Sequence, residues 1–392
     1  MKITENIETS VKYECDVTVV GGGVGGIAAA LAAARSGSSV MLVESGYMLG
    51  GLATAGLVTI YLPLCDGLGT QVSYGIAEEL LRLSIKHGTE ENVKYSEPYC
   101  WLGEGSIEQR KERRYEVQFN PWFFALDAER LLISEGVKII YGASVVSTLR
   151  DGKNITHLVI EGKSGREAIS TRAVVDASGD AVVAYLAGAE CAEYAPKNML
   201  AAWYYYNDGK NNKLNMLGVC DDPDGEVKPL VNKRYRALGT DEISEMMIDS
   251  HASTYNDIIR KRASGERVFP TAISAIPQVR MTRRIVGKST SNTSDERKYI
   301  DGSIGAFSNW RKRGPAYELS FGTICTNDID NLFAAGRCIS ATDDMWDLTR
   351  VIPVCAVSGE AAGVAASMVC NGTLEIGLLQ RTLCERGVKI HL

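Results

Sequence analysis

The chain has 392 residues, a length that favours two domains over a single hydrophobic core. With 45% hydrophobic and 23% charged residues, it has the composition of an ordinary soluble globular protein. The net charge of −6 argues against nucleic acid as the main partner, because nucleic-acid-binding proteins usually carry a basic excess.

Cysteine usage and the N-terminus predict where the protein works. Ten cysteines are scattered without a C-x-x-C pair or a His/Cys cluster at zinc spacing, so we expect reduced thiols and no metal site. The opening residues "MKITENIETSVKYE" lack the order of a signal peptide, and no apolar run approaches the roughly 20 residues of a membrane span. We therefore expect a cytoplasmic protein that is not held in a membrane.

Residues 15–44 predict a strand, a helix and a second strand. "DVTVV" suits a buried parallel strand, "VGGIAAALAAARSG" an alanine-rich helix, and "SVMLVE" the next strand. The first turn contains Gly21-x-Gly23-x-x-Gly26, the spacing of a dinucleotide-binding turn. There Gly21 permits the tight turn, Gly23 lets a pyrophosphate approach the backbone, and Gly26 lets helix and strand pack closely.

Glu44, at the end of the second strand, supports a dinucleotide site. It follows Gly26 by eighteen residues, where an acid can accept hydrogen bonds from ribose hydroxyls. A glycine-rich turn without a ligand is the alternative, but strand, helix, second strand and acid occur in the required order. The phosphates would then lie at the helix N-terminus, where free N–H groups and the helix dipole favour an anion.

Later segments are expected to converge on the same ligand. Gly50-Gly51 marks a second close approach of the backbone. Apolar strands at 171–176 and 331–335 both run into glycine-containing turns, "DASG" and "AGRC". A helix follows from Pro353, and proline is favoured at the first position of a helix.

Together these motifs resemble the FAD-dependent oxidoreductases of the glutathione-reductase-like flavoproteins. That group carries the patterns GGGxGGxxAAxxAAxxG, VxLxE, GG and NLxxAGRCxS, which read here "GGGVGGIAAALAAARSG", "VMLVE", "GG" and "NLFAAGRCIS". More narrowly, the chain is similar to a bacterial branch related to the fumarate reductase flavoproteins. The resemblance runs from about Cys15 to the final "LLQRTLCERGV" and implies FAD as cofactor.

The resemblance implies a set of cofactor-binding residues. The first glycine turn would hold the pyrophosphate, Glu44 the adenosine ribose, and the segment after Gly50 the region near the flavin. The helix from Pro353 would direct its N-terminus at the pyrimidine edge of the flavin, where it stabilises the negative charge of the reduced form. The implied residues are Gly21, Gly23, Gly25, Gly26, Glu44, Gly50, Gly51, Ala53, Thr54, Ala177, Gly179, Gly336, Arg337 and Pro353.

The chain departs from its relatives at two places. Many relatives carry a histidine where this chain has Asp343, so a proton-transfer role is not carried over to that position. Relatives that bind flavin covalently have a histidine near the Gly-Gly segment, and this chain has none there. We therefore expect noncovalent FAD.

The resemblance also implies the fold class, an α/β protein. Residues 1–60, 121–190 and 325–392 are predicted to form a Rossmann-like FAD-binding domain with a parallel sheet. Residues 61–120 and 191–324 interrupt it and are predicted to form a nested α+β substrate domain over the flavin. The strands expected to share the sheet lie at 15–20, 40–44, 171–176 and 331–335.

Three side chains are candidates for the substrate side. Arg350 stands three residues before the helix that should point at the flavin, where a positive charge can orient an anion; alternatively it pairs with the acids of "SATDDMWDLTR". Arg280 either faces the substrate or forms salt bridges where the domains meet. Tyr205, in "AAWYYYND", either lines the cavity or belongs to the core of a strand.

Other catalytic groups are poorly marked. Cys338 and Cys355 lie near the expected flavin, but without a C-x-x-C partner buried packing is the simpler interpretation. The four histidines belong to no motif.

We expect a FAD-dependent oxidoreductase that transfers hydride between flavin N5 and a small organic, anionic substrate. The alternative is a flavin-binding subunit of an electron-transfer complex, or an RNA-modifying flavoprotein. The acidic net charge disfavours RNA, and the absence of cysteine-rich cluster motifs disfavours a built-in electron relay. Isomerisation or halogenation with the flavin stays open, and the sequence does not identify the substrate or the oligomeric state.

Overall fold

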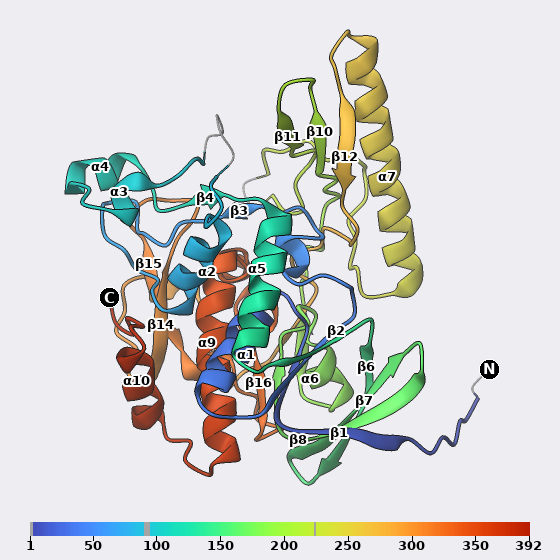
Figure 1. Ribbon diagram of the computed structural model, residues 1–392, viewed down its shortest axis with the longest axis vertical. Coiled ribbons are helices and arrows are strands. Elements are labelled where there is room, and N and C mark those ends of the chain that lie inside the picture. Colours follow the sequence, from blue (N-terminus) through green and yellow to red (C-terminus); the bar gives the residue numbers. More distant parts are fainter. Residues whose placement is uncertain (1–2, 90–94, 223–224) are drawn as a thin grey trace.

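A computed structural model describes residues 3–89, 95–222 and 225–392. The strands of its central sheet are β1 (Ser10–Val20), β2 (Val40–Glu44), β5 (Lys138–Tyr141), β6 (Ser144–Asp151), β7 (Asn154–Gly162), β8 (Gly165–Asp176) and β16 (Leu332–Ala334). They are arranged in the order β5-β2-β1-β8-β7-β6, and β16 pairs with the C-terminal end of β8 (Figure 1).

The middle of this sheet is parallel. β5, β2, β1, β8 and β16 all run in one direction, whereas β7 pairs antiparallel with the start of β8 and β6 pairs antiparallel with β7 at the edge of the sheet. Val17 and Val19 of β1 are fully buried, as expected for a strand covered on both faces. The prediction that four sequence-separated strands share one sheet is confirmed; the antiparallel β6–β7 extension was not predicted.

The helices are α1 (Val24–Arg35), α2 (Ile76–Ser84), α3 (Tyr99–Leu102), α4 (Ile107–Glu112), α5 (Pro121–Ser134), α6 (Val182–Leu186), α7 (Thr240–Ala263), α8 (Asp343–Thr349), α9 (Ile352–Cys370) and α10 (Ile376–Glu385). Of these, α1 and α9 pack tightly together against the central sheet. A Cβ on Gly359 or Gly363 of α9 would overlap the backbone oxygen of Gly25 or Ala29 in α1. The small residues of α9 therefore allow close contact with α1.

The helix α9 is long and apolar enough, by length and composition, to cross a membrane. Within the protein, however, 94% of its apolar window is buried, as in the core helix of a globular protein. The sequence expectation concerned uninterrupted apolar runs, and Ser358, Gly359 and Glu360 interrupt this one; the helix as a whole is nevertheless apolar enough by composition.

The remaining strands form small antiparallel sheets. They are β3 (Ile60–Tyr61) with β4 (Val117–Gln118), β9 (Cys191–Glu193) with β13 (Arg283–Ile285), β14 (Ser303–Ser308) with β15 (Ala316–Ser320), and β10 (Tyr204–Asn207) between β11 (Asn212–Asn215) and β12 (Phe269–Ile273). Figure 1 shows β10, β11, β12 and the long helix α7 together at one end of the molecule, away from the central sheet.

The division into an FAD-binding and a substrate domain stays a prediction. The helix α2 lies in the predicted substrate part but packs against α9 of the predicted FAD-binding part. Leu80, Phe307 and Val357 accordingly belong to one continuous hydrophobic core. Segments assigned to the two parts therefore share a core around the central sheet.

Candidate functional site

A cavity of about 820 Å³ lies at the carboxyl ends of β1, β2 and β8. This volume is in the upper part of the range of about 300–1,000 Å³ that is usual for ligand and cofactor sites. The turn after β1, the loops after β2 and β8, and the turns at Gly336 and Val351 all contribute to its wall. Segments far apart in the sequence thus meet at one site, as the motifs predict.

The glycines of the first turn have different local roles. Gly21 has φ of +100°, a left-handed conformation that L side chains rarely adopt, and a Cβ there would overlap the Ala177 carbonyl oxygen. A Cβ on Gly26 would overlap the carbonyl oxygen of Gly21. Gly23, by contrast, lines the cavity and has no atom within 4 Å of an added Cβ. Of these three, Gly23 is the one whose missing side chain leaves space for a ligand.

The N-terminus of α1 meets the cavity beside Glu44. Gly23 is the N-cap of α1 and supplies no capping side chain, so backbone N–H groups of the first turn are left to bind an anion. Glu44 accepts hydrogen bonds from the backbone N–H groups of Gly22 and Gly46, both at 2.6 Å. A carboxylate has about four acceptor sites, so it can still accept ribose hydroxyls.

The second glycine pair folds back onto the first turn. Gly50 donates its N–H to the carbonyl oxygen of Gly22 at 2.8 Å, and an added Cβ on Gly51 would lie 3.3 Å from Cα of Gly23. Thr54 donates its hydroxyl to the carbonyl oxygen of Leu49, and this hydrogen bond stabilises the loop. The pair therefore brings the loop that carries Ala53 to the cavity wall.

The turn after β8 is fixed by a buried acid. Asp176 is fully buried and accepts hydrogen bonds from the N–H and hydroxyl of Ser178 and from the N–H of Ala184. Burial raises the pKa of Asp176. Ala177 and Gly179 line the cavity from this turn.

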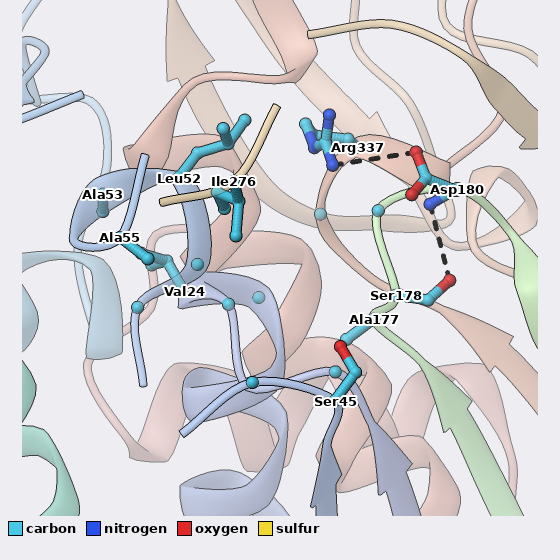
Figure 2. A pocket seen from close by; sticks show the side chains of 18 of the residues that line it. Val24, Ser45, Leu52, Ala53, Ala55, Ala177, Ser178, Asp180, Ile276 and Arg337 are labelled. Carbon is cyan, nitrogen blue, oxygen red and sulfur yellow. Dashed lines mark hydrogen bonds and ion pairs between the residues drawn. The ribbon is translucent and has the colours of Figure 1, made fainter. Parts of the chain in front are cut away.

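The turn after β16 places an arginine at the cavity. Gly336 donates its N–H to the hydroxyl of Ser358 in α9 at 3.0 Å. Arg337 donates to the carbonyl oxygens of Val279 and Arg280 and lies 3.8 Å from the Asp180 carboxylate. Figure 2 shows Arg337 and Asp180 together at one side of the cavity, away from the apolar residues Leu52 and Ile276.

Most of the predicted cofactor-binding residues line this cavity. Those that do are Gly21, Gly23, Gly25, Glu44, Gly50, Gly51, Ala53, Ala177, Gly179, Gly336 and Arg337. Gly26, Thr54 and Pro353 are not among the lining residues. Gly26 packs against the backbone of Gly21, and Thr54 is hydrogen-bonded to Leu49. Pro353 lies in the first turn of α9, and the residue before it, Ile352, does line the cavity.

Arg350 lines the cavity, but its charge is already paired. Its guanidinium donates to Asp221 at 3.0 Å and to Asp347, and Arg311 binds the same two carboxylates. Burial opposes ionisation of Asp221, but the charges of Arg350 and Arg311 together with hydrogen bonds to the carboxylate lower its pKa. The acid Asp347 was anticipated as a partner, whereas Asp221 was not.

Arg280 also lines the cavity, and no carboxylate of the described residues forms an ion pair with it. Its side chain lies over the ring of Trp203 at 5.5 Å, and the residue is only 4% exposed. Among the described residues, its Nη1 has no hydrogen-bond partner. Burial, together with nearby Arg350, lowers the pKa of Arg280. A buried, unpaired guanidinium at a cavity wall is suited to an anionic group of a ligand.

Of the two positions considered for Tyr205, the structure shows the buried strand position and not the cavity wall. Its side chain is fully buried, its hydroxyl lies 2.8 Å from that of Thr59, and its ring packs against Trp122. Asp343 also lies outside the cavity wall, 3.8 Å from Arg284.

The two cysteines near the site differ in position. Cys355 lines the cavity, and burial raises its pKa to about 12. Cys338 is fully buried outside the cavity wall, and burial raises its pKa too. Both thiols therefore stay protonated near neutral pH, which does not favour a nucleophilic role.

Sequence reasoning missed several lining residues. They are apolar or small and include Leu52, Val58, Ile60, Leu62, Ala143, Val145, Ala237, Ile243, Ile276, Pro277 and Val279. Residues directly after β2, such as Ser45 and Tyr47, could have been found, because ligands bind beyond the carboxyl ends of parallel strands. The apolar residues carry no comparable signal.

The chemistry of the wall fits a flavin dinucleotide. The open space at Gly23 and the free N–H groups of α1 suit a pyrophosphate, while Glu44 suits a ribose. The apolar residues beyond Gly51 suit the faces of a planar ring. These residues would hold FAD at the carboxyl ends of the strands.

Solved structures with related folds are distant in sequence. CabE, an aromatic hydroxylase from angucycline biosynthesis, is 15% identical over 95% of this chain, with a TM-score of 0.47; the chain spans 66% of its length. A geranylgeranyl bacteriochlorophyll reductase-like protein from Thermoplasma acidophilum is 14% identical over 95% of this chain and 84% of its own, with a TM-score of 0.47.

A third solved structure is similarly distant. The p-nitrophenol 4-monooxygenase PnpA from Pseudomonas putida DLL-E4 is 15% identical over 95% of this chain and 84% of its own, with a TM-score of 0.48. A search of curated proteins finds no match.

The profile of the FAD dependent oxidoreductase family gives a direct assignment. It matches residues 16–201 and 296–380, which together make up more than half of the chain. All the predicted cofactor-binding residues lie within these two ranges, whereas residues 202–295 lie outside them. The chain therefore belongs to the FAD-dependent oxidoreductase family, and FAD is its cofactor.

Proposed function

We propose that the protein binds FAD noncovalently and transfers hydride between flavin N5 and a small organic substrate that carries an anionic group. The observation that carries this proposal is Arg280, a buried guanidinium at the cavity wall whose Nη1 lacks a partner among the described residues. The narrower relationship to the fumarate reductase flavoproteins is part of the same proposal.

The apolar part of the cavity wall supports a substrate that is mostly apolar. Ile276, Pro277 and Val279 precede Arg280 in the chain, and Leu52 and Val58 come from the loop that follows Gly51. Figure 2 shows Leu52, Ala55 and Ile276 grouped at one end of the cavity. Apolar walls exclude water, and a single charged group then fixes the orientation of the bound molecule.

The first turn of α9 supplies a second electrostatic feature. Val351 is its N-cap and gives no capping side chain, and Val351 and Ile352 line the cavity. The free N–H groups there favour negative charge at this end of the site. When bound, FAD supplies the hydride acceptor or donor at N5, while these residues orient and stabilise what binds beside it.

Arg280→Met tests this function, because methionine keeps the apolar stem and removes the charge. Purified holoprotein would be mixed anaerobically with small carboxylic acids and with their neutral amides, and flavin bleaching would be followed. We expect acids to bleach the flavin, and the variant to bind the active acid about 10- to 100-fold more weakly, the loss typical of a hydrogen bond to a charged group. Its flavin content should stay unchanged.

Arg284→Met is the matched control. Arg284 also lies over a tryptophan ring, at 5.2 Å from Trp346, and its Nε lacks a partner among the described residues, but it is not part of the cavity wall. We expect normal substrate binding in this variant. Equal bleaching by acids and amides, or loss of flavin in Arg280→Met, would contradict an anionic substrate held by Arg280.

A further inference from the structure

The helix α7 presents an apolar stripe to solvent. Ile248 and Tyr255 are 66% and 64% exposed, Ile259 is 45% exposed, and Ala252 is also exposed. The spacings of four, three and four residues place these four side chains, here called the α7 stripe, on one face of the helix. Figure 1 shows α7 along the outer edge of the molecule.

The opposite face of α7 already serves the fold. Met246 and Ile258 are buried there together with the polar residues Ser250, Thr254 and Asp257. Asp257 accepts a hydrogen bond from the hydroxyl of Tyr204 in β10 at 2.7 Å. The helix thus buries a partly polar face and exposes an apolar one, the reverse of the usual arrangement for a surface helix. Large exposed apolar side chains in a contiguous row commonly mark an interaction site.

Charges at the two ends of the stripe identify the kind of partner. Glu245 lies three residues before Ile248, and Arg262 lies three residues after Ile259, so both continue the same face. Both residues are exposed. The stripe is therefore acidic at one end, apolar in the middle and basic at the other end. A second copy of the same helix, turned antiparallel, presents the complementary pattern.

We propose that two copies of this chain associate through antiparallel pairing of their α7 stripes. With the two-fold axis between Ala252 and Tyr255, Ile248 packs against Ile259 of the partner subunit. The small Ala252 makes room for Tyr255 of the partner subunit, and Glu245 pairs with Arg262 of the partner subunit. A parallel arrangement would instead bring like charges together at both ends, which is unfavourable.

Existing contacts at the ends of the stripe do not prevent this pairing. Glu245 forms an ion pair with Lys233, but both side chains are about half exposed, so exchanging partners costs little. Arg262 lies over the ring of Phe269 at 5.5 Å, and Phe269 is itself 52% exposed. The apolar contact surface can therefore extend onto Phe269. The whole stripe lies in residues 202–295, outside the family match.

Charge reversal tests the pairing in the full-length holoprotein. We expect sedimentation velocity to show a reversible dimer with a dissociation constant in about the micromolar range, because one helix pair is a small interface. Glu245→Arg and Arg262→Glu should each weaken dimerisation at least about tenfold, and the double variant should restore it. Tyr255→Lys should give a monomer with unchanged flavin content and melting temperature.

Ile133→Lys is the control, since Ile133 is a comparably exposed apolar residue (60%) on α5. It should dimerise like the unmodified protein. A protein that stays monomeric at about 100 μM would overturn the proposal, as would a dimer that survives Tyr255→Lys. Failure of the double variant to restore dimerisation would overturn the antiparallel charge pairing.

Discussion

Gly23 and Gly26 lie three residues apart in one turn, yet their missing side chains matter for different reasons. At Gly26 an added Cβ would overlap backbone, so only glycine allows the turn to close. At Gly23 the backbone is extended (φ −66°, ψ 176°), a conformation that any residue can adopt, and the space around an added Cβ is open. The requirement at Gly23 therefore comes from the cofactor rather than from the fold.

Gly23→Ala separates these two requirements. We expect the variant to fold with a melting temperature close to that of the unmodified protein, because alanine suits this backbone. FAD should bind at least about tenfold more weakly, because the new methyl group occupies the approach of the pyrophosphate. Flavin content after gel filtration and an FAD titration of the apoprotein give the two measurements.

Gly239→Ala is a matched control for this change. Gly239 is also an N-cap with extended backbone and no atom within 4 Å of an added Cβ, but it is not part of the cavity wall. It should retain full FAD binding. If Gly23→Ala binds FAD as tightly as this control does, the phosphate does not lie where the glycine motif predicts.

Also at the residue scale, the sequence predicted the roles of the glycines and of Glu44 better than the roles of the arginines. The glycine turn is a local motif, and the spacing of its glycines is enough to predict the backbone conformation of the turn. The state of an arginine depends on acids that can lie anywhere in the chain: Asp221, which pairs with Arg350, is 129 residues away from it. Sequence proximity suggested the acids near Arg350 but could not show that Arg280 lacks a partner.

At the scale of elements, α9 carries a buried acid between two glycines that pack on α1. Glu360 is 2% exposed and accepts the N–H of Ile76, the first residue of α2, at 2.8 Å. Burial raises its pKa to about 7 from an ordinary value of 4.5, against the opposing effects of this N–H and of Arg386. The folded protein therefore holds a proton at Glu360 that the unfolded chain loses at lower pH.

This difference gives stability a defined pH dependence. Between about pH 4.5 and 7 the folded state binds more protons at this site than the unfolded state, so the stabilisation is complete at low pH and is lost as pH rises. Glu360→Gln removes the titration while keeping the size of the side chain. We expect the stability of the unmodified protein relative to this variant to fall by up to about 3 kcal/mol between about pH 5 and 8. Urea unfolding in excess FAD measures it, and parallel pH profiles would contradict it.

The elements themselves were predicted unevenly. β1, β2, β8 and β16 followed from apolar runs that end in glycine turns, a strong local signal. The strands β6 and β7 mix exposed and buried residues without a regular alternation, and the antiparallel pairing of β7 with β8 and of β6 with β7 is not encoded by any single segment. For the same reason the sequence could not decide what the small residues of α9 contact.

At the scale of the whole molecule, a buried ion cluster joins distant parts of the chain. Asp221 lies in the predicted substrate part, while Arg350 and Asp347 lie beside the cofactor cavity. Arg311, from a further segment, binds both carboxylates. Ala237 and Ile276, also from the predicted substrate part, line the same cavity. The ion cluster thus holds the predicted substrate part next to the cofactor cavity, and residues of the predicted substrate part help to enclose this cavity.

Asp221→Asn should therefore lower the free energy of unfolding more than the loss of an ordinary surface ion pair does. The variant leaves the buried Arg350 with one carboxylate in place of two, and breaking a buried pair of this kind typically costs about 3–5 kcal/mol. Because Asp347 remains, we expect about 2–3 kcal/mol, together with faster proteolysis of residues 202–295. Arg236→Gln, which breaks the exposed pair with Glu193, is the control and should cost less than about 1 kcal/mol. Equal unfolding free energies for the two variants in urea, with equal proteolysis, would show that the cluster does not hold these parts together.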